Sequence, residues 1–230
     1  WMYCGFQSEN ATKAALVERH PRESFTLADK LNTGFFDDEA GRDKMFAQQL
    51  EKTGAGYFDY YLLHGVDRAN YEKFERLHCF EFLAEKKAQG LIRSAGLSFH
   101  DTADLLDKIL TQHPEMEFVQ LQINYLDWES PWIQARACYE VAVKHGKPVI
   151  VMEPVKGGTL ANVPEQVKSL FSAHSAASPA SWAIRFAASL EGVKMVLSGM
   201  SNLAQLEDNL SFMEEFTPLT EAEKGIVAQA

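Results

Sequence analysis

Three residues carry groups that can hold or move a proton and are expected at strand ends or in an adjoining loop: Tyr3, Lys30 and His64. His64 is the clearest of the three, because it ends the run Tyr57–His64 and is followed at once by Gly65. Aromatic and aliphatic residues fill that run, which makes it the most strand-like stretch of the chain. Taken singly, each residue is better explained by a structural role: Tyr3 as a packing aromatic, Lys30 as a solvated side chain, and His64 as a hydrogen-bonded ring.

Six predicted strands alternate with helices along the chain. The strands are predicted at 24–31, 57–64, 92–98, 118–123, 148–152 and 193–197. The helices are predicted at 8–20, 39–51, 69–89, 102–112, 133–145, 179–190, 203–213 and 221–230. Strict alternation predicts a parallel sheet with right-handed crossovers. Neither GxGxxG nor GxxxxGK[ST] follows a strand, which disfavours Rossmann and P-loop folds. We therefore expect an α/β fold of the (β/α)8 TIM-barrel class, whose active face is formed by the C-terminal ends of the strands.

A complete barrel of this class has two more strands than we predict here. The sequence starts at Trp1 without an initiator methionine, and the missing strands would precede residue 24. We expect residues 1–230 to be a single barrel domain that is truncated at its N-terminus. Because unpaired strand edges promote aggregation, we also expect either upstream residues or a second copy of the chain to cover the gap.

Composition narrows the classes of partner. The 230 residues are 46% hydrophobic and 23% charged, as in an ordinary globular protein, and the net charge is −10. This acidic balance argues against nucleic acid and anionic membranes as partners, and no segment is apolar enough to span a membrane. Cys4, Cys79 and Cys138 form no CxxC pair, so we expect neither a disulfide framework nor a metal site. We expect the protein to be located in a reducing cytoplasm.

Several segments, in this order along the chain, resemble motifs of the aldo-keto reductases. They are WMY at the start, LADKL around Lys30, YYLLHG around His64, GLSFH at 96–100 and SGMSNLAQLEDNL at 198–210. The resemblance covers nearly the whole chain. It implies a reductase of aldehydes or ketones that uses NAD(P)H.

The resemblance implies a role for each of the three residues named first. Tyr3 would be the general acid, and His64 would orient the carbonyl through a hydrogen bond. An unperturbed tyrosine has a pKa of about 10, and Lys30 would lower the pKa of Tyr3 because a nearby cation favours the phenolate. The family also has an aspartate that pairs with the lysine, but its position falls before Trp1. Asp29 is not assigned to that role, because neighbouring side chains on a strand point to opposite faces.

The resemblance also implies a set of cofactor contacts. Ser98 and Gln120 match positions that hold the nicotinamide carboxamide, and Gly157 matches the loop along the pyrophosphate. Met152 stands where many relatives stack an aromatic ring on the nicotinamide, so this chain departs from the pattern there. The positions that match the adenosine phosphate and adenine sites are Gly199, Met200, Ser201, Gln205, Asp208 and Asn209. Some relatives have an arginine at the position of Gln205, so NADP is expected while NAD stays open.

The second half of the chain resembles bacterial reductases that often carry a C-terminal ferredoxin-like tail with iron–sulfur clusters, and we expect no cluster within these residues. Two other functions stay open. One is a non-catalytic, nicotinamide-binding subunit that senses or scaffolds. The other is an unrelated barrel enzyme that binds phosphate at Gly199 and the helix after it.

Overall fold

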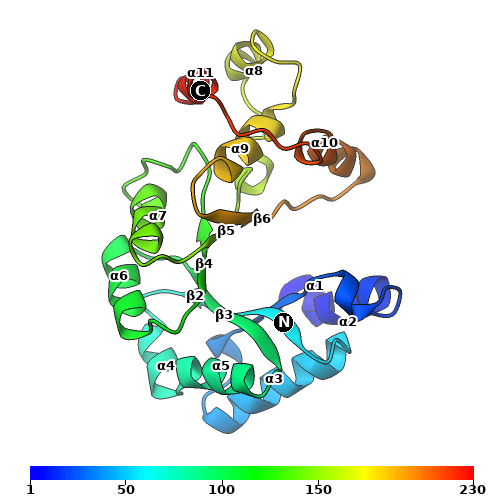
Figure 1. Ribbon diagram of the computed structural model, residues 1–230, viewed down its shortest axis with the longest axis vertical. Coiled ribbons are helices and arrows are strands. Elements are labelled where there is room, and N and C mark those ends of the chain that lie inside the picture. Colours follow the sequence, from blue (N-terminus) through cyan, green and yellow to red (C-terminus); the bar gives the residue numbers. More distant parts are fainter. The chain divides into compact units, whose positions relative to one another are not determined.

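The computed structural model describes all 230 residues, and its six strands belong to one sheet. They are β1 (Ala28–Leu31), β2 (Phe58–Val66), β3 (Ile92–Phe99), β4 (Phe118–Gln122), β5 (Val149–Met152) and β6 (Val193–Val196). The strands follow one another in chain order. The pairs β1–β2, β2–β3 and β5–β6 are parallel. Parallel strands that alternate with helices confirm the predicted α/β class (Figure 1).

Helices precede, connect and follow the strands. They are α1 (Tyr3–Phe6), α2 (Ser8–Thr12), α3 (Glu39–Thr53), α4 (Tyr71–Arg76), α5 (Cys79–Ala88), α6 (Ala103–Gln112), α7 (Ala135–Lys144), α8 (Glu165–Ser172), α9 (Pro179–Ala188), α10 (Leu203–Met213) and α11 (Glu221–Val227). A π-helical turn, Lys13–Val17, extends α2, and 3-10 turns lie at Arg22–Ser24, Thr33–Phe35 and Lys156–Gly158. None of these helices combines the length and the hydropathy that crossing a membrane requires.

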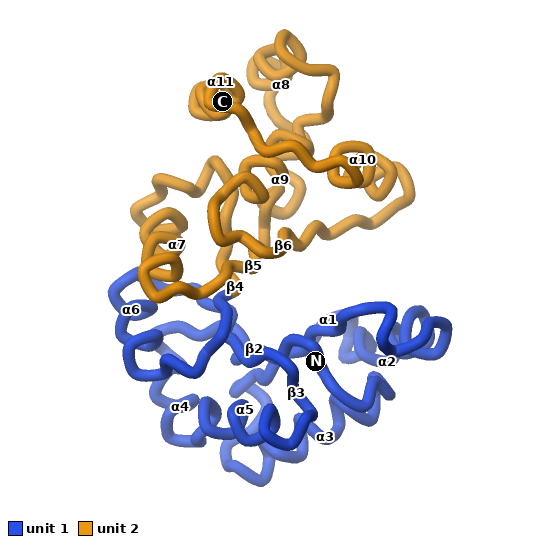
Figure 2. The backbone as a smooth tube through the Cα atoms, in the orientation of Figure 1, with its two compact units in different colours: residues 1–119 blue, residues 120–230 orange.

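The chain forms two compact units, residues 1–119 and residues 120–230 (Figure 2). Unit 1 carries β1 to β3 with α1 to α6, and unit 2 carries β5 and β6 with α7 to α11. The assignment of residues 1–230 to a single barrel domain stays a prediction.

The core of unit 1 lies between its strands and the helices that pack on them. In α3, Phe46 makes edge-on ring contacts with Phe58 and Tyr61 of β2 and with Phe82 of α5, at centroid distances of 6.0, 5.0 and 5.6 Å. Phe58 and Tyr61 are fully buried. Burial of this aromatic run explains why it forms a strand, since strands of parallel sheets are typically covered on both faces.

The predicted helix 69–89 is two helices, α4 and α5, because the backbone is left-handed at His78, where φ is +49°. The buried Arg42 guanidinium of α3 donates hydrogen bonds to the carbonyl groups of Leu77 and His78. Carbonyl groups at the break between the two helices therefore accept charge-assisted hydrogen bonds from an arginine that is distant in the sequence. The prediction of one continuous helix is wrong here, since hydrophobic spacing does not reveal such a partner.

β1 begins at Ala28, later than the predicted strand 24–31. Just before it, the N–H of Leu27 donates to the Asp59 carboxylate at 2.9 Å, and Arg22 holds the same carboxylate at 2.7 Å. A side chain rather than the sheet therefore satisfies this N–H. The regular strand therefore starts only at Ala28, and residues 22–24 form a 3-10 turn instead.

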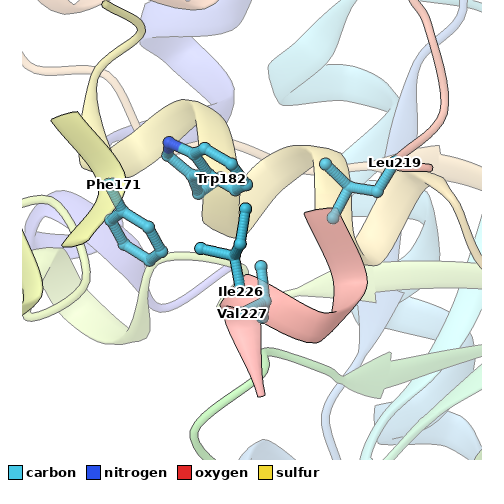
Figure 3. Packing of buried hydrophobic residues seen from close by; sticks show 5 residues of the cluster. All are labelled: Phe171, Trp182, Leu219, Ile226 and Val227. Atoms are coloured by element: carbon cyan, nitrogen blue, oxygen red, sulfur yellow. The ribbon is translucent and has the colours of Figure 1, made fainter. Parts of the chain in front are cut away.

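In unit 2, the segment after β5 contains a helix, α8, that we did not predict. It contributes Phe171 to a buried cluster with Trp182 of α9, Leu219, and Ile226 and Val227 of α11 (Figure 3). The rings of Phe171 and Trp182 stack at 4.8 Å with an interplanar angle of 9°. This cluster holds α8, α9 and α11 together.

Candidate active site

His64 lies near the end of β2, where the strand leaves its regular pairing with β3. The register shifts between Leu63 and Val66. Gly65 has a φ of +62°, which residues with a Cβ rarely adopt, and its N–H donates to the Ser98 hydroxyl at 2.8 Å. Gly65 thus permits the irregularity and Ser98 holds it. The buried Ser98 hydroxyl accepts a hydrogen bond from the Gly65 N–H. The nicotinamide contact expected for Ser98 stays a prediction.

Tyr3 and His64 are in direct contact. Tyr3 Oη lies 3.1 Å from His64 Nε2, and the two ring centroids are 5.9 Å apart. The other ring nitrogen, His64 Nδ1, lies 3.1 Å from Nδ2 of Asn32. Tyr3 is 54% exposed, so the fold does not enclose this side chain. The structure therefore brings two of the three predicted catalytic residues within hydrogen-bond distance.

Lys30 belongs to β1, the neighbour of β2 in the sheet. Its backbone carbonyl accepts a hydrogen bond of 2.9 Å from the buried side chain of Gln49. Burial lowers the pKa of the Lys30 ammonium, and the Asp29 carboxylate opposes this change. Lys30 is close enough to His64 to lower the pKa of that ring. No hydrogen bond joins Lys30 to Tyr3, and catalytic hydrogen bonds are often loose before a substrate binds.

Asp29 does not share the surroundings of Lys30. It lies in register with Tyr61, whose ring packs on Phe46 of α3. Burial raises the pKa of Asp29 to about 6. These contacts place Asp29 on the strand face that α3 covers, as the alternation of side chains predicts.

The His64 ring is neutral near pH 7. Burial, with the positive charge of Lys30, lowers the pKa of His64 from 6.5 to about 4. A neutral imidazole carries one N–H donor and one acceptor nitrogen. His64 can therefore orient a polar group by one directional hydrogen bond, without adding a positive charge.

The depressed pKa of His64 predicts a pH dependence of stability. Between about pH 4 and pH 6.5, His64 is protonated in the unfolded chain but neutral in the native state. The free energy of unfolding should therefore rise with pH through this window and fall on acidification.

Urea unfolding at about pH 7 and about pH 4.5 measures this change. Between the two pH values, the wild-type chain should lose more free energy of unfolding than His64→Gln. Asp29 titrates in both proteins, so it cancels in the comparison. Equal losses would contradict the burial of a neutral ring.

Unit 2 contains a cavity of about 620 Å³, a volume within the usual range for small-molecule sites. The loop after β5, the first turns of α9, the residues after β6 and the start of α10 form its walls. Seven predicted cofactor contacts line it: Gly157, Gly199, Met200, Ser201, Gln205, Asp208 and Asn209. Its charged lining consists of Glu153 and Asp208, with no lysine or arginine.

The loop after β5 has an unusual backbone. Glu153 and Lys156 have φ angles of +57° and +49°, and two glycines with positive φ follow. Such conformations in non-glycine residues persist only where the surroundings hold them. The Lys156 ammonium bonds the Asp127 carboxylate, and Asn124 donates to the Glu153 carbonyl at 3.2 Å. Although burial opposes it, hydrogen bonds from Lys156 and Asn124 hold the pKa of Asp127 below its usual value. This buried anion therefore anchors the loop that lines the cavity.

The start of α10 is already hydrogen-bonded by its own side chains. Asn202 caps the helix by accepting from the Gln205 N–H at 2.9 Å, and Gln205 Oε1 accepts from the Ser201 N–H at 2.6 Å. Asp208 accepts a bond of 2.7 Å from Ser178, the N-cap residue of α9. A phosphate could take the Ser201 N–H only by displacing the Gln205 amide.

The two remaining predicted cofactor contacts of unit 2 touch each other. Gln120 Nε2 lies 3.1 Å from the sulfur of Met152. Neither belongs to the lining of the cavity. Their expected contacts with the nicotinamide stay predictions.

The whole sequence, residues 1–230, matches the profile of the Aldo/keto reductase family. The chain belongs to this family. The expected class of activity, an NAD(P)-dependent oxidoreductase, is confirmed at that level. No curated protein matches the sequence.

Solved aldo-keto reductases are similar to this chain in fold. Aldo-keto reductase AKR11C1 from Bacillus halodurans, in its holo form, has a TM-score of 0.74 at 23% identity, over 96% of this chain and 76% of that one. A thermostable aldo-keto reductase in complex with the inhibitor epalrestat has a TM-score of 0.79 at 19% identity, over 99% and 78%. An aldo/keto reductase from Klebsiella pneumoniae in complex with NADP and acetate has a TM-score of 0.76 at 17% identity, over 99% and 77%. The likeness confirms the fold class expected from the sequence.

Two features of this aldo/keto reductase were missed in the sequence analysis. Asn32 follows Lys30 by two residues at the end of β1, and its contact with His64 had only that position as a signal. The ion pair of Asp127 and Lys156 joins segments about 30 residues apart, and no local pattern announces it.

Proposed function

We propose that this aldo/keto reductase reduces the carbonyl group of a small-molecule aldehyde or ketone, with NADPH or NADH as the hydride donor. The observation that carries the proposal is Tyr3 Oη, which lies 3.1 Å from a neutral His64, with Lys30 close to the same ring. Reduction of a carbonyl needs a proton donor at the oxygen, and a positioned hydroxyl can be that donor.

A reduced nicotinamide, when bound, would supply the hydride for the carbonyl carbon, and the electron pair of the carbon–oxygen π bond would pass to the oxygen. Tyr3 Oη gives its proton to the carbonyl oxygen, so the products are an alcohol and the oxidised cofactor. The Tyr3 phenolate that remains accepts a hydrogen bond from His64 and is attracted by the Lys30 cation. Solvent then returns the proton to Tyr3.

The cavity of unit 2 suits the adenosine and phosphate portion of the cofactor. Gly157 leaves room for close approach to the backbone, since an added Cβ would meet nothing within 4 Å and its φ is +60°. The N-terminus of α10 is an electropositive end that favours a phosphate group. We propose that Gly199, Met200 and Ser201 approach this phosphate and that Gln205, Asp208 and Asn209 contact the adenosine. The Klebsiella pneumoniae enzyme, described with NADP bound, supports this choice of cofactor.

The cavity offers the 2′-phosphate of NADPH no cationic side chain, so we expect weak discrimination between NADPH and NADH. Gln205→Arg should tighten NADPH about 10- to 150-fold relative to NADH, because a charge-assisted hydrogen bond is worth about 1.5–3 kcal/mol. The variant also releases the Ser201 N–H. Fluorescence titration with each cofactor measures the ratio. The control is Gln229→Arg, an exposed glutamine after α11, and an equal shift in both variants would contradict the assignment.

The function is tested by following the absorbance of reduced nicotinamide with a panel of aldehydes and ketones. We expect absorbance loss that depends on the chain, the cofactor and the carbonyl together. Binding of the cofactor without turnover of any carbonyl would instead support the non-catalytic subunit. If neither NADPH nor NADH binds, both functions are wrong.

A further inference from the structure

Both ring nitrogens of His64 are engaged, and one partner is an amide. Asn32 Nδ2 lies 3.1 Å from Nδ1, and Tyr3 Oη lies 3.1 Å from Nε2. Asn32 is the first residue after β1, so it is held close to the strand end that carries Lys30. The proton of a neutral His64 must sit on one of these two nitrogens.

The orientation of the Asn32 amide decides which one. Asn32 Oδ1 accepts a hydrogen bond of 2.8 Å from the N–H of Gly34, and only the oxygen of an amide can accept. The other amide atom, Nδ2, therefore faces His64, and a second contact of Nδ2 reaches the sulfur of Met2 at 3.4 Å. An amide nitrogen donates and does not accept. Nδ1 of His64 must therefore be the unprotonated nitrogen, and the proton lies on Nε2.

We propose that Asn32 is a positioning residue that holds His64 in the Nε2–H tautomer. In this tautomer, Nε2–H donates to Tyr3 Oη, so the hydroxyl proton of Tyr3 is not consumed by the histidine and can point toward a substrate. In the opposite tautomer, Nε2 would accept the Tyr3 proton and remove it from the reaction. Burial favours the neutral ring in which this choice exists. The catalytic consequence rests on the proposed function, whereas the tautomer itself does not.

Two substitutions of Asn32 test whether its amide group sets the tautomer of His64. In Asn32→Asp, a carboxylate can only accept, so it should draw the proton to Nδ1 and reverse the tautomer or leave the ring doubly protonated. In Asn32→Leu, neither tautomer is held and we expect a mixture. Asn10→Asp is the matched control, because Asn10 is exposed in α2 and its amide bonds the side chain of Gln7.

The measurement is long-range 1H–15N NMR of the full chain labelled at histidine, with the His64 signals assigned by their absence in His64→Gln. We expect a protonated Nε2 and a bare Nδ1 in the wild type and in Asn10→Asp, with protonation of Nδ1 in Asn32→Asp. The kcat for carbonyl reduction should fall about 10²-fold in Asn32→Asp, the cost of losing one preorganised donor, while cofactor affinity stays unchanged.

Protonation at Nδ1 in the wild type, or an unchanged tautomer in Asn32→Asp, would overturn the inference whatever the activity. The wild-type spectrum decides the first point even if a variant fails to fold. If the tautomers are as expected but the wild type reduces no carbonyl, the inference stands and the proposed function fails.

Discussion

A Tyr3→Phe variant is expected to reduce carbonyl substrates about 10²–10⁴-fold more slowly than the wild type, the usual contribution of a positioned general acid. The change removes only the hydroxyl that lies 3.1 Å from His64 Nε2. It leaves the cavity of unit 2 intact, so the affinity for reduced nicotinamide should stay the same. Steady-state kinetics with a fixed aldehyde, and fluorescence titration of the cofactor, measure the two quantities.

Tyr139→Phe is the matched control. The Tyr139 hydroxyl donates to the Glu191 carbonyl at 2.7 Å and belongs to α7 of unit 2. Its loss should leave kcat near the wild-type value. If Tyr3→Phe also keeps the wild-type rate, the proton reaches the carbonyl oxygen from another group, and the role proposed for Tyr3 is wrong.

The sequence predicted the order of strands and helices because that order is written in local patterns. Burial of whole strands produces apolar runs such as Tyr57–Leu63, which can be recognised without knowledge of distant contacts. The errors in the predicted element boundaries arose where contacts between residues distant in the sequence determine the boundary. Arg42 supplies the partner at the break between α4 and α5, and Asp59 binds the Leu27 N–H just before the late start of β1. Neither residue carries a local sign of its distant partner.

The candidate site shows the same division. The motifs placed Tyr3 and His64 at the ends of their segments, and the structure brings the two side chains together. Spacing could not predict that Asn32 would bind the far side of the His64 ring, because hydrogen-bond direction depends on how an amide is turned. It could not predict the capped start of α10 either, where the Gln205 amide accepts from the Ser201 N–H.

Trp182→Ala is expected to lower the free energy of unfolding of unit 2 by about 3–5 kcal/mol, the usual cost of truncating a buried tryptophan. Trp182 is fully buried and stacks on Phe171 within the cluster that joins α8, α9 and α11 (Figure 3). Removing the indole leaves a cavity that the surrounding helices can fill only in part. Urea unfolding followed by far-UV circular dichroism measures the loss. Trp132→Ala is the control, because Trp132 is 90% exposed and should change stability by less than about 0.5 kcal/mol.

A second substitution at the same position tests the physical cause. Trp182 Nε1 is buried without a hydrogen-bond partner, so the wild-type chain already carries the cost of an unsatisfied N–H. Trp182→Phe removes that N–H and keeps a ring that can stack on Phe171. It should therefore lose less than half of the stability that Trp182→Ala loses, although phenylalanine is smaller. Equal losses in the two variants would mean that the retained ring does not stabilise the cluster, and no loss in either would mean that this cluster does not hold α8, α9 and α11 together. Because Ser178, Ala180 and Ile184 of the α9 segment line the cavity, a loosened α9 should also weaken cofactor binding in Trp182→Ala, and Trp182→Phe should preserve it.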